Sequence, residues 1–313
     1  MPALRSRKKS RLKIPKLDYF WVAAGAILGV LLLEALYLGY NYYQSTKEYR
    51  SFSEKNNQKK LLSLSPAPLP AKLQQQLQQT KENKITEYRV PILMFHYVEN
   101  VADKGDKTRI SLNVNPYTFE QEIKTLVAAG YTFLTNSQLT DSMDGKMPLP
   151  EKPILLTFDD GYQDFYTDVF PILKKYKVKA TAYVISGFLN FNNEMTTSEL
   201  KEVAASGLVE IGAHTVHHVW LKKISLTKAS FEIFQSRVTL QQITGQPVVS
   251  FAYPYGAFDD QAIQVVKDAG FSSAVSTMPG DDQSAINRYF LFRLRPGGRT
   301  GQVLLNWLNQ TKF

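Results

Sequence analysis

Two adjacent carboxylates follow an apolar run and are the first residues along the chain with an evident capacity for chemistry. Asp159 and Asp160 come directly after the run 153–158, PILLTF, and precede Gly161. Adjacent side chains of an extended chain point in opposite directions, so one carboxylate can bind a metal ion while the other faces a substrate water. The alternative is structural, because aspartates at such a turn also cap the helix that follows.

Three of the chain's four histidines lie within five residues, at positions 214, 217 and 218. Histidines that only make buried hydrogen bonds would be scattered singly. Residues four apart on a helical turn can present two imidazoles to one ion, which favours His214 and His218 over His217. With one aspartate they form a site that leaves positions open for water and substrate, as hydrolytic zinc requires. The chain contains no cysteine, so any metal must be held by His, Asp or Glu.

A third group of residues stands at the end of the apolar run 248–254. Pro254 fixes the backbone there, and Gly256 permits a sharp turn. The amide of Tyr255 can therefore point inward and donate a hydrogen bond to an oxyanion. Without the other two groups, this pattern is an ordinary strand-to-turn signal.

The net charge of +9 does not indicate a nucleic-acid-binding protein. Residues 1–18 contain seven basic residues and one acidic residue, which accounts for +6 of the total. The remainder of the chain, at +3, has no basic stripe with interleaved aromatic residues. We therefore expect no nucleic-acid partner.

An apolar segment, residues 19–40, predicts a membrane anchor. As a helix it would be about 33 Å long, enough to cross a hydrocarbon core of ~30 Å. Aromatic residues stand at both of its ends, and Glu34 is its one charged residue. A cleaved signal peptide is the alternative, but this segment ends in bulky tyrosines rather than in a small-residue cleavage site. The basic tail 1–18 predicts a cytoplasmic N-terminus, and hence a catalytic domain outside the cell membrane.

A polar, glutamine-rich stalk over residues 41–88 is expected to separate this anchor from an α/β domain over residues 89–313. In that domain apolar strands alternate with amphipathic helices, and no glycine-rich phosphate loop is present, which favours a parallel (β/α) barrel. Thr118 and Gln121 form an expected capping box. The expected strands are 89–95, 131–134, 153–158, 178–184, 208–214, 248–254 and 271–276. The expected helices are 118–129, 166–176, 197–205, 227–244 and 259–269.

The three groups of residues, taken in order, resemble the motifs of the polysaccharide deacetylase family, also called the NodB homology family. The matching sequences are TFDDG at 157–161, HTVHH at 214–218 and PYG at 254–256. The resemblance implies a distorted (β/α) barrel with its reacting groups at the strand ends. It further implies that Asp159 is the general base and that Asp160, His214 and His218 bind Zn²⁺, or another divalent metal such as Co²⁺ or Ni²⁺.

The chain departs from the common family pattern before the third motif, where Phe251 or Ala252 stands at the position of an expected arginine. It also lacks a clear Asp-Trp motif and a late histidine. However, PILMFHY at 91–97 resembles the leading motif of a subgroup that deacetylates poly-N-acetylglucosamine. In this interpretation His96 protonates the departing amine, and Arg293, within the closing arginine segment, lies near the base.

These observations predict a metal-dependent hydrolase that removes N-acetyl groups from an N-acetylglucosamine-containing polysaccharide of the cell surface or envelope. Its partners would be an acetylated glycan and, through the N-terminal helix, the membrane. One alternative is a surface glycan-binding protein without catalytic activity. Another is an O-acetyl polysaccharide esterase or a peptidoglycan deacetylase that uses the same site.

Overall fold

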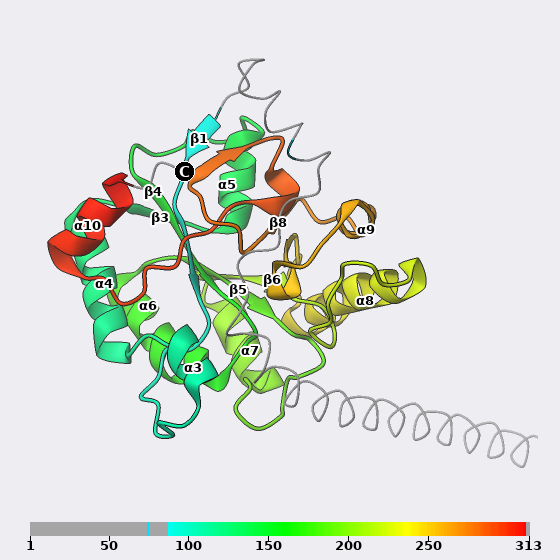
Figure 1. Cartoon of the computed structure of the whole chain (residues 1–313), viewed down its shortest axis with the longest axis horizontal. Coiled ribbons are helices and arrows are strands. Elements are labelled where there is room, and N and C mark those ends of the chain that lie inside the picture. Colours follow the sequence, from blue (N-terminus) through cyan, green and yellow to red (C-terminus); the bar gives the residue numbers. More distant parts are fainter. Residues whose placement is uncertain (1–73, 75–86, 311–313) are drawn as a thin grey trace, which may run out of the picture. The chain divides into compact units, whose positions relative to one another are not determined.

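The computed structural model describes residue 74 and residues 87–310, all of which belong to the unit Glu54–Phe313 (Figure 1). Among these residues no helix has both the length and the apolar character needed to cross a bilayer. The predicted tail (1–18) and anchor (19–40) lie outside the described residues. So does the predicted stalk (41–88), apart from residues 74, 87 and 88.

A curled sheet of seven strands runs through the described residues, and every strand pair in it is parallel. Its main order is β2-β4-β5-β6-β7-β8, with β3 paired to β4. The strands β2, β4, β5, β7 and β8 are buried along their whole length, as expected for a parallel sheet covered on both faces. The bounds are β2 Ile92–Phe95, β3 Thr132–Leu134, β4 Pro153–Phe158, β5 Ala180–Val184, β6 Val209–Ala213, β7 Ser250–Ala252 and β8 Ser273–Val275.

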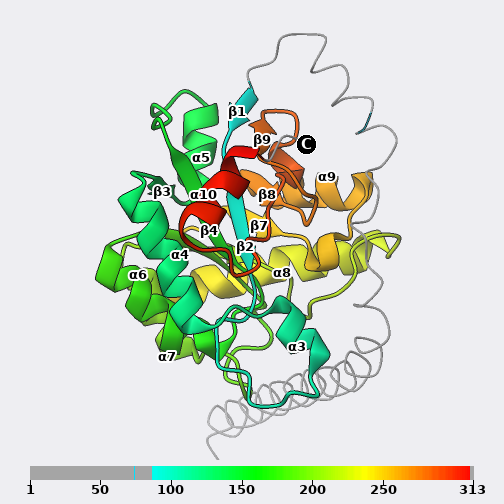
Figure 2. The same ribbon diagram turned by 60° about the vertical axis from the view of Figure 1, so that its left-hand side comes forward.

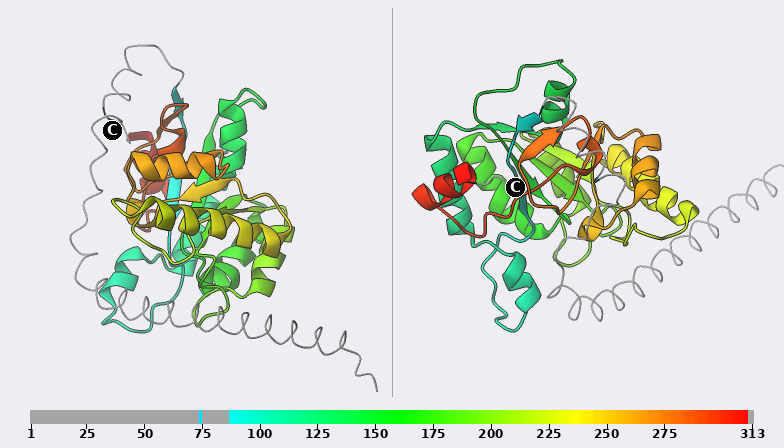
Figure 3. Two further views of the ribbon diagram at one scale, coloured as in Figure 1. Left: turned by 90° about the vertical axis from the view of Figure 1, so that its right-hand side faces the viewer. Right: turned by 45° about the horizontal axis from the view of Figure 1, so that its top comes forward.

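Helices cover the outer face of this sheet, as Figures 2 and 3 show. Two of them, α7 and α8, pack against β6, and α4 packs against α6 and α10. The helices are α3 Lys107–Leu112, α4 Pro116–Ala128, α5 Asn136–Met143, α6 Phe170–Tyr176, α7 Thr197–Ala205, α8 Leu226–Thr244, α9 Asp260–Asp268 and α10 Gly301–Gln310. A small antiparallel pair, β1 Glu87–Arg89 and β9 Asp282–Ser284, lies beside them.

Helix α4 begins earlier than its sequence predicted, and the expected capping box is wrong. Asn115 is the N-cap, its side chain accepting a hydrogen bond from the amide of Tyr117, and Pro116 follows in the first turn. Proline is favoured there because its fixed φ suits a helix and its missing N–H would have no partner. Thr118 therefore lies inside the helix. The expected single helix 166–176 is also divided, into a π-helical turn, Phe165–Val169, and then α6.

The barrel is closed without a regular eighth strand. Residues 291–294 lie between the two edge strands of the sheet, and isolated bridges pair Leu291 with Val275 of β8 and Leu294 with Leu93 of β2. The amide of Leu294 donates to the carbonyl of Ile92 at 2.8 Å, so the seam is hydrogen-bonded. The predicted distorted barrel is thus a curled parallel sheet joined by one short extended segment.

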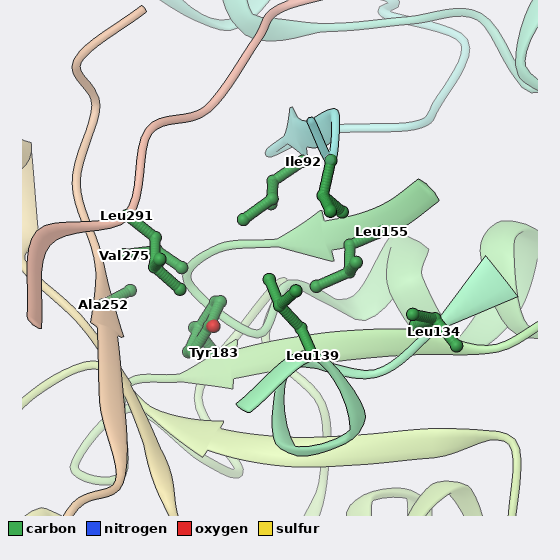
Figure 4. Close-up of a cluster of buried hydrophobic side chains, with 9 residues drawn as sticks. Ile92, Leu134, Leu139, Leu155, Tyr183, Ala252, Val275 and Leu291 are labelled. Carbon is green, nitrogen blue, oxygen red and sulfur yellow. The ribbon is translucent and has the colours of Figure 1, made fainter. Parts of the chain in front are cut away.

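The interior of the barrel is filled by side chains that come from neighbouring strands and from the seam (Figure 4). The largest of them is the ring of Tyr183 on β5, which is fully buried. Gly212 on β6 makes room for this ring, because a Cβ atom at that position would lie 2.4 Å from it. The core cluster contains Val90, Ile92, Leu134, Leu139, Leu155, Tyr183, Ala252, Val275 and Leu291.

Candidate active site

Polar residues gather where the parallel strands end. Asp159 follows β4, His214 follows β6, and His96 follows β2. The carboxyl ends of parallel strands lie at one edge of a sheet, so residues far apart in the chain meet there. The sequence predicted that these polar residues would lie together at the strand ends. The structure shows which groups each of them contacts.

Asp160, His214 and His218 form the cluster that can hold a metal ion, with their ligand atoms all within 4.8 Å of one another. The Oδ1 atom of Asp160 lies 3.4 Å from Nε2 of His214 and 3.3 Å from Nε2 of His218. Ligand atoms at about 2.0–2.1 Å from a tetrahedral ion lie about 3.3 Å apart, so these two distances fit zinc coordination.

The ring orientation of His214 also suits metal binding. Its Nδ1 lies 2.8 Å from the carbonyl oxygen of Ala252, to which an Nδ1–H group donates. This tautomer leaves a lone pair on Nε2, the atom that faces Asp160. A histidine ligand commonly has its second nitrogen held in this way.

Asp160 provides the third ligand atom from a strained turn. Its φ of 78° and that of Gly161, 90°, are both left-handed, so the backbone turns sharply after Asp159 and the two carboxylates diverge. The Oδ1 atom of Asp160 is buried, and no described residue donates a hydrogen bond to it. Burial tends to raise the pKa of Asp160, but its interactions with the nearby imidazoles of His218 and His214 outweigh this effect and lower it. A buried, ionised oxygen without a donor fits a metal ligand.

Asp159 is held by Arg293, 134 residues later in the chain. The guanidinium makes two parallel bonds to the carboxylate, of 2.7 and 2.8 Å, and Arg293 is only 1% exposed. Arg293 also donates to the carbonyl of Ser276 at 2.7 Å. Burial tends to raise the pKa of Asp159, but Arg293 outweighs it and lowers that pKa. The carboxylate is therefore ionised and oriented, as an acceptor of protons or hydrogen bonds must be.

His96 lies beside this pair, with its Nε2 atom 3.9 Å from Oδ2 of Asp159. Burial lowers the pKa of His96, and the positive charges of Arg295 and Arg293 act in the same direction. The charges of Asp159 and Asp160 oppose this shift without reversing it. His96 thus lies next to Asp159, the neighbour of the ligand candidate Asp160, where its ring could exchange a proton with a bound substrate.

Tyr255 lies in the short turn Pro254–Gly256 with a left-handed φ of 59°. Its ring packs against the ring of His218, with the centroids 4.4 Å apart, and stands 5.8 Å from that of Trp220. Gly256 is required here, because a Cβ atom would lie 2.0 Å from the hydroxyl oxygen of Thr277. The turn thus brings the predicted oxyanion residue against a metal-ligand histidine.

Two tyrosines that the sequence interpretation passed over also line the site. The rings of Tyr97 and Tyr162 stack at a centroid distance of 4.1 Å, and the guanidinium of Arg109 lies 4.4 Å from the centre of the Tyr97 ring. Burial and the charge of Asp160 both raise the pKa values of the two phenols, so their hydroxyls stay protonated. Their positions in the sequence could have identified them, because Tyr97 follows His96 and Tyr162 follows the DDG turn.

Comparison with known proteins places the chain in a family. A family model for polysaccharide deacetylase matches residues 146–274. YxkH of Bacillus subtilis, assigned to the polysaccharide deacetylases, is 30% identical over 225 residues, which cover 72% of this chain and 77% of YxkH. A poly-β-1,6-N-acetyl-D-glucosamine N-deacetylase of Staphylococcus aureus is 32% identical over 196 residues, 58% of this chain and 67% of that protein. The chain belongs to the polysaccharide deacetylase family.

Solved structures show the same fold. The deacetylase PplD of Streptococcus pyogenes, in complex with acetate, aligns with a TM-score of 0.66 and 30% identity over 73% of this chain and 100% of PplD. The polysaccharide deacetylase BC0361 of Bacillus cereus aligns with a TM-score of 0.63 and 31% identity, over 71% of this chain and 69% of that one. The predicted family and the predicted α/β fold with a curled parallel sheet are therefore confirmed.

Proposed function

We propose that this protein is a divalent-metal-dependent hydrolase that removes N-acetyl groups from an N-acetylglucosamine-containing polysaccharide of the cell envelope. The main support is the juxtaposition of the Asp160, His214 and His218 cluster with a second carboxylate, Asp159, that is oriented by Arg293. A metal-binding group and a separate proton acceptor are the two requirements of hydrolytic deacetylation. Similarity to a poly-N-acetylglucosamine deacetylase favours an amide substrate.

The three ligand residues hold the metal, for which Zn²⁺ is the first choice and Co²⁺ or Ni²⁺ are alternatives with the same ligand set. When bound, such an ion supplies Lewis-acid polarisation of the acetyl group and of water. Asp159 accepts a proton as water adds to the acetyl carbon, and the amide of Tyr255 stabilises the oxyanion. His96, in its protonated form, donates a proton to the nitrogen as the C–N bond breaks, so that acetate and a free amine leave.

Acetate release from a panel of glycans tests this proposal. We expect Zn²⁺-dependent release from poly-N-acetylglucosamine and chitooligosaccharides that stops when a chelator removes the metal. Release from acetylxylan alone would instead indicate an O-acetyl esterase, and release from peptidoglycan alone would indicate a peptidoglycan deacetylase. If the purified protein bound glycan but bound no metal and released no acetate, a non-catalytic glycan-binding protein would be the correct interpretation.

The variant Asp159→Asn separates the two roles assigned to the paired carboxylates. An amide can accept a hydrogen bond from water but cannot take its proton, so we expect bound metal to be retained and turnover to fall by ~100-fold or more. Metal analysis and acetate release on the same sample measure both quantities. Loss of the metal from this variant would make Asp159 a ligand.

The location of the enzyme is also a proposal. The basic residues 1–18 and the apolar residues 19–40 favour a single-pass anchor with a cytoplasmic N-terminus. The catalytic domain would then act outside the membrane, where envelope glycans are found. A reporter fused after Phe313 should be active only on the outer side, and activity confined to the cytoplasm would refute this topology.

A further inference from the structure

The loop that carries two of the three candidate metal ligands has an unfavourable backbone. The chain leaves β6 after Ala213, and in the loop that follows Thr215 and His218 have left-handed φ angles of 66° and 54°. This region is sparsely populated by residues other than glycine, and a β-branched threonine is especially disfavoured there. The surrounding structure must therefore hold the loop in place.

Glu232 of α8 makes the contacts that hold it from one side. Its Oε2 atom accepts hydrogen bonds from the amides of Val216 and His217, at 3.0 and 2.9 Å. Its Oε1 atom lies 2.9 Å from Nδ1 of the His217 ring. All three contacts fall on the two residues nearest to the ligand His218 on its N-terminal side, and Glu232 is only 2% exposed.

The opposite side of the same loop is held by the segment that follows β5. The amide of Ser186 donates to the carbonyl of Thr215 at 3.2 Å, and the amide of Gly187 donates to the carbonyl of Val216 at 3.0 Å. The donors and acceptors of the loop are thus engaged from two directions. The Ser186 and Gly187 bonds come from backbone atoms, so Glu232 is the part of this arrangement that one substitution can remove.

We propose that Glu232 is a positioning residue for the metal site. It fixes the positions of the imidazoles of His214 and His218. It acts through the loop backbone and does not touch the metal. This inference rests on the metal-dependent function proposed above and explains why His217, the histidine left out of the cluster, faces a buried carboxylate. Groups that orient ligands in this way commonly contribute about 10- to 100-fold to metal affinity.

A carboxylate is the side chain best suited to this position. It offers two acceptor oxygens, which serve two amides and one ring nitrogen, and burying it without such donors would be strongly unfavourable. Glutamine retains one acceptor oxygen, so it can preserve the contacts to Val216 and His217 amides, but its NH₂ group cannot accept a hydrogen bond from the His217 ring. Alanine removes every contact.

The experiment measures Zn²⁺ affinity of the full chain by competition with a chelator, for the wild type and the variants Glu232→Gln and Glu232→Ala. We expect Kd for Zn²⁺ to rise about 10- to 100-fold in Glu232→Ala and by a smaller factor in Glu232→Gln. The electronic spectrum of the Co²⁺-loaded protein should also change, because it reports the arrangement of the ligands. The matched control is Glu122→Gln, a buried glutamate of α4 whose carboxylate makes no hydrogen bond to the loop, and its Zn²⁺ affinity should equal that of the wild type.

The outcomes of this experiment distinguish a positioning role for Glu232 from a purely structural one. If Glu232→Ala and Glu232→Gln bind Zn²⁺ as tightly as the wild type while only the melting temperature of the metal-free protein falls, Glu232 is merely structural and the inference is wrong. Should Glu232→Ala fail to fold, Glu232→Gln and its Co²⁺ spectrum carry the same test. If the wild type itself binds no Zn²⁺, Co²⁺ or Ni²⁺, the proposed function fails first, and this inference fails with it.

Discussion

Two buried carboxylates, Asp159 at the strand ends and Glu122 on helix α4, respond to burial in opposite ways. Burial tends to raise both pKa values, but Arg293 lowers that of Asp159, whereas the pKa of Glu122 rises to about 8. The backbone of Gly298 and the charge of Arg299 offset only part of the rise in pKa that burial causes. No described residue donates a hydrogen bond of normal geometry to the carboxylate oxygens of Glu122.

The difference shows where this protein compensates for buried charge. At the active site an arginine from a distant segment makes two bonds to the carboxylate, which offsets the unfavourable desolvation and fixes the carboxylate's orientation. Among the described residues none pairs with Glu122 in this way, and its pKa of about 8 favours the neutral form at neutral pH. Burial alone therefore does not mark a functional carboxylate, and the groups that face its oxygens must be considered as well.

Removing a ligand carboxylate has the largest expected effect. In Asp160→Ala the two remaining imidazoles cannot hold a hydrolytic metal ion, so we expect metal and activity to be lost together. His214→Ala and His218→Ala should behave in the same way, and His217→Ala should be mild by comparison. Metal content and acetate release are the measurements. Emptying of the site by His217→Ala but not by His218→Ala would contradict the choice of ligands.

Removing the candidate acid comes next. We expect His96→Ala to retain metal and fold and to lower the deacetylation rate by ~10²–10⁴-fold, because the amine would leave without a positioned proton donor. The rate, the metal content and the melting temperature should be measured together. Near-normal turnover would remove His96 from the mechanism.

Substituting Arg293 makes Asp159 resemble Glu122, a buried carboxylate without a partner. Breaking a buried ion pair on one side typically destabilises a protein by about 3–5 kcal/mol. We therefore expect the free energy of unfolding of Arg293→Met, measured by urea denaturation, to fall by that amount and its activity to be lost. Arg293→Lys is the conservative comparison, since it keeps the charge but cannot make the two parallel bonds. If Arg293→Met were as stable as the wild type, the pair would not compensate for the burial of Asp159.

Neutralising Glu122 should change stability and not the metal site, and the size of the change depends on pH. Between the unfolded pKa of 4.5 and the folded pKa of about 8, the folded state holds a proton that the unfolded state has released. The free energy of unfolding of the wild type should therefore be highest below pH 4.5, as far as this group is concerned, and fall as the pH rises to about 8.

The variant Glu122→Gln lacks this dependence and should exceed the wild type in stability at pH 8.5 by a few kcal/mol, with about 1.4 kcal/mol for each unit of pKa difference as the upper bound. Urea denaturation at pH 4.5, 6.5 and 8.5 measures the difference in the free energy of unfolding between the variant and the wild type. An exposed glutamate, Glu151, is the control, and Glu151→Gln should leave the curve unchanged. If the free energy of unfolding of Glu122→Gln depended on pH as strongly as that of the wild type, the raised pKa of Glu122 would not be the cause of this dependence.

Much of the fold followed from local patterns, because strand and helix signals are short-range. Helix 197–205 was predicted at its observed bounds, where Thr196 and Glu199 form a capping box. Helix α5, 136–143, was missed, because its polar sequence gives little amphipathic signal and its capping box, Thr135 with Gln138, carries the information instead. The seam 291–294 could not be predicted from local pattern, because its pairing depends on where β2 and β8 lie.

The sequence by itself determined the family and the candidate reacting groups, because these lie in short motifs whose residue types suit the chemistry. Asp159 and Asp160 are adjacent, and His214 and His218 are four residues apart. Only the tertiary structure decided what surrounds them. The partners of these residues are contributed by other strands and helices, so their distances and burial depend on how the sheet curls and closes, which no local pattern of residues records.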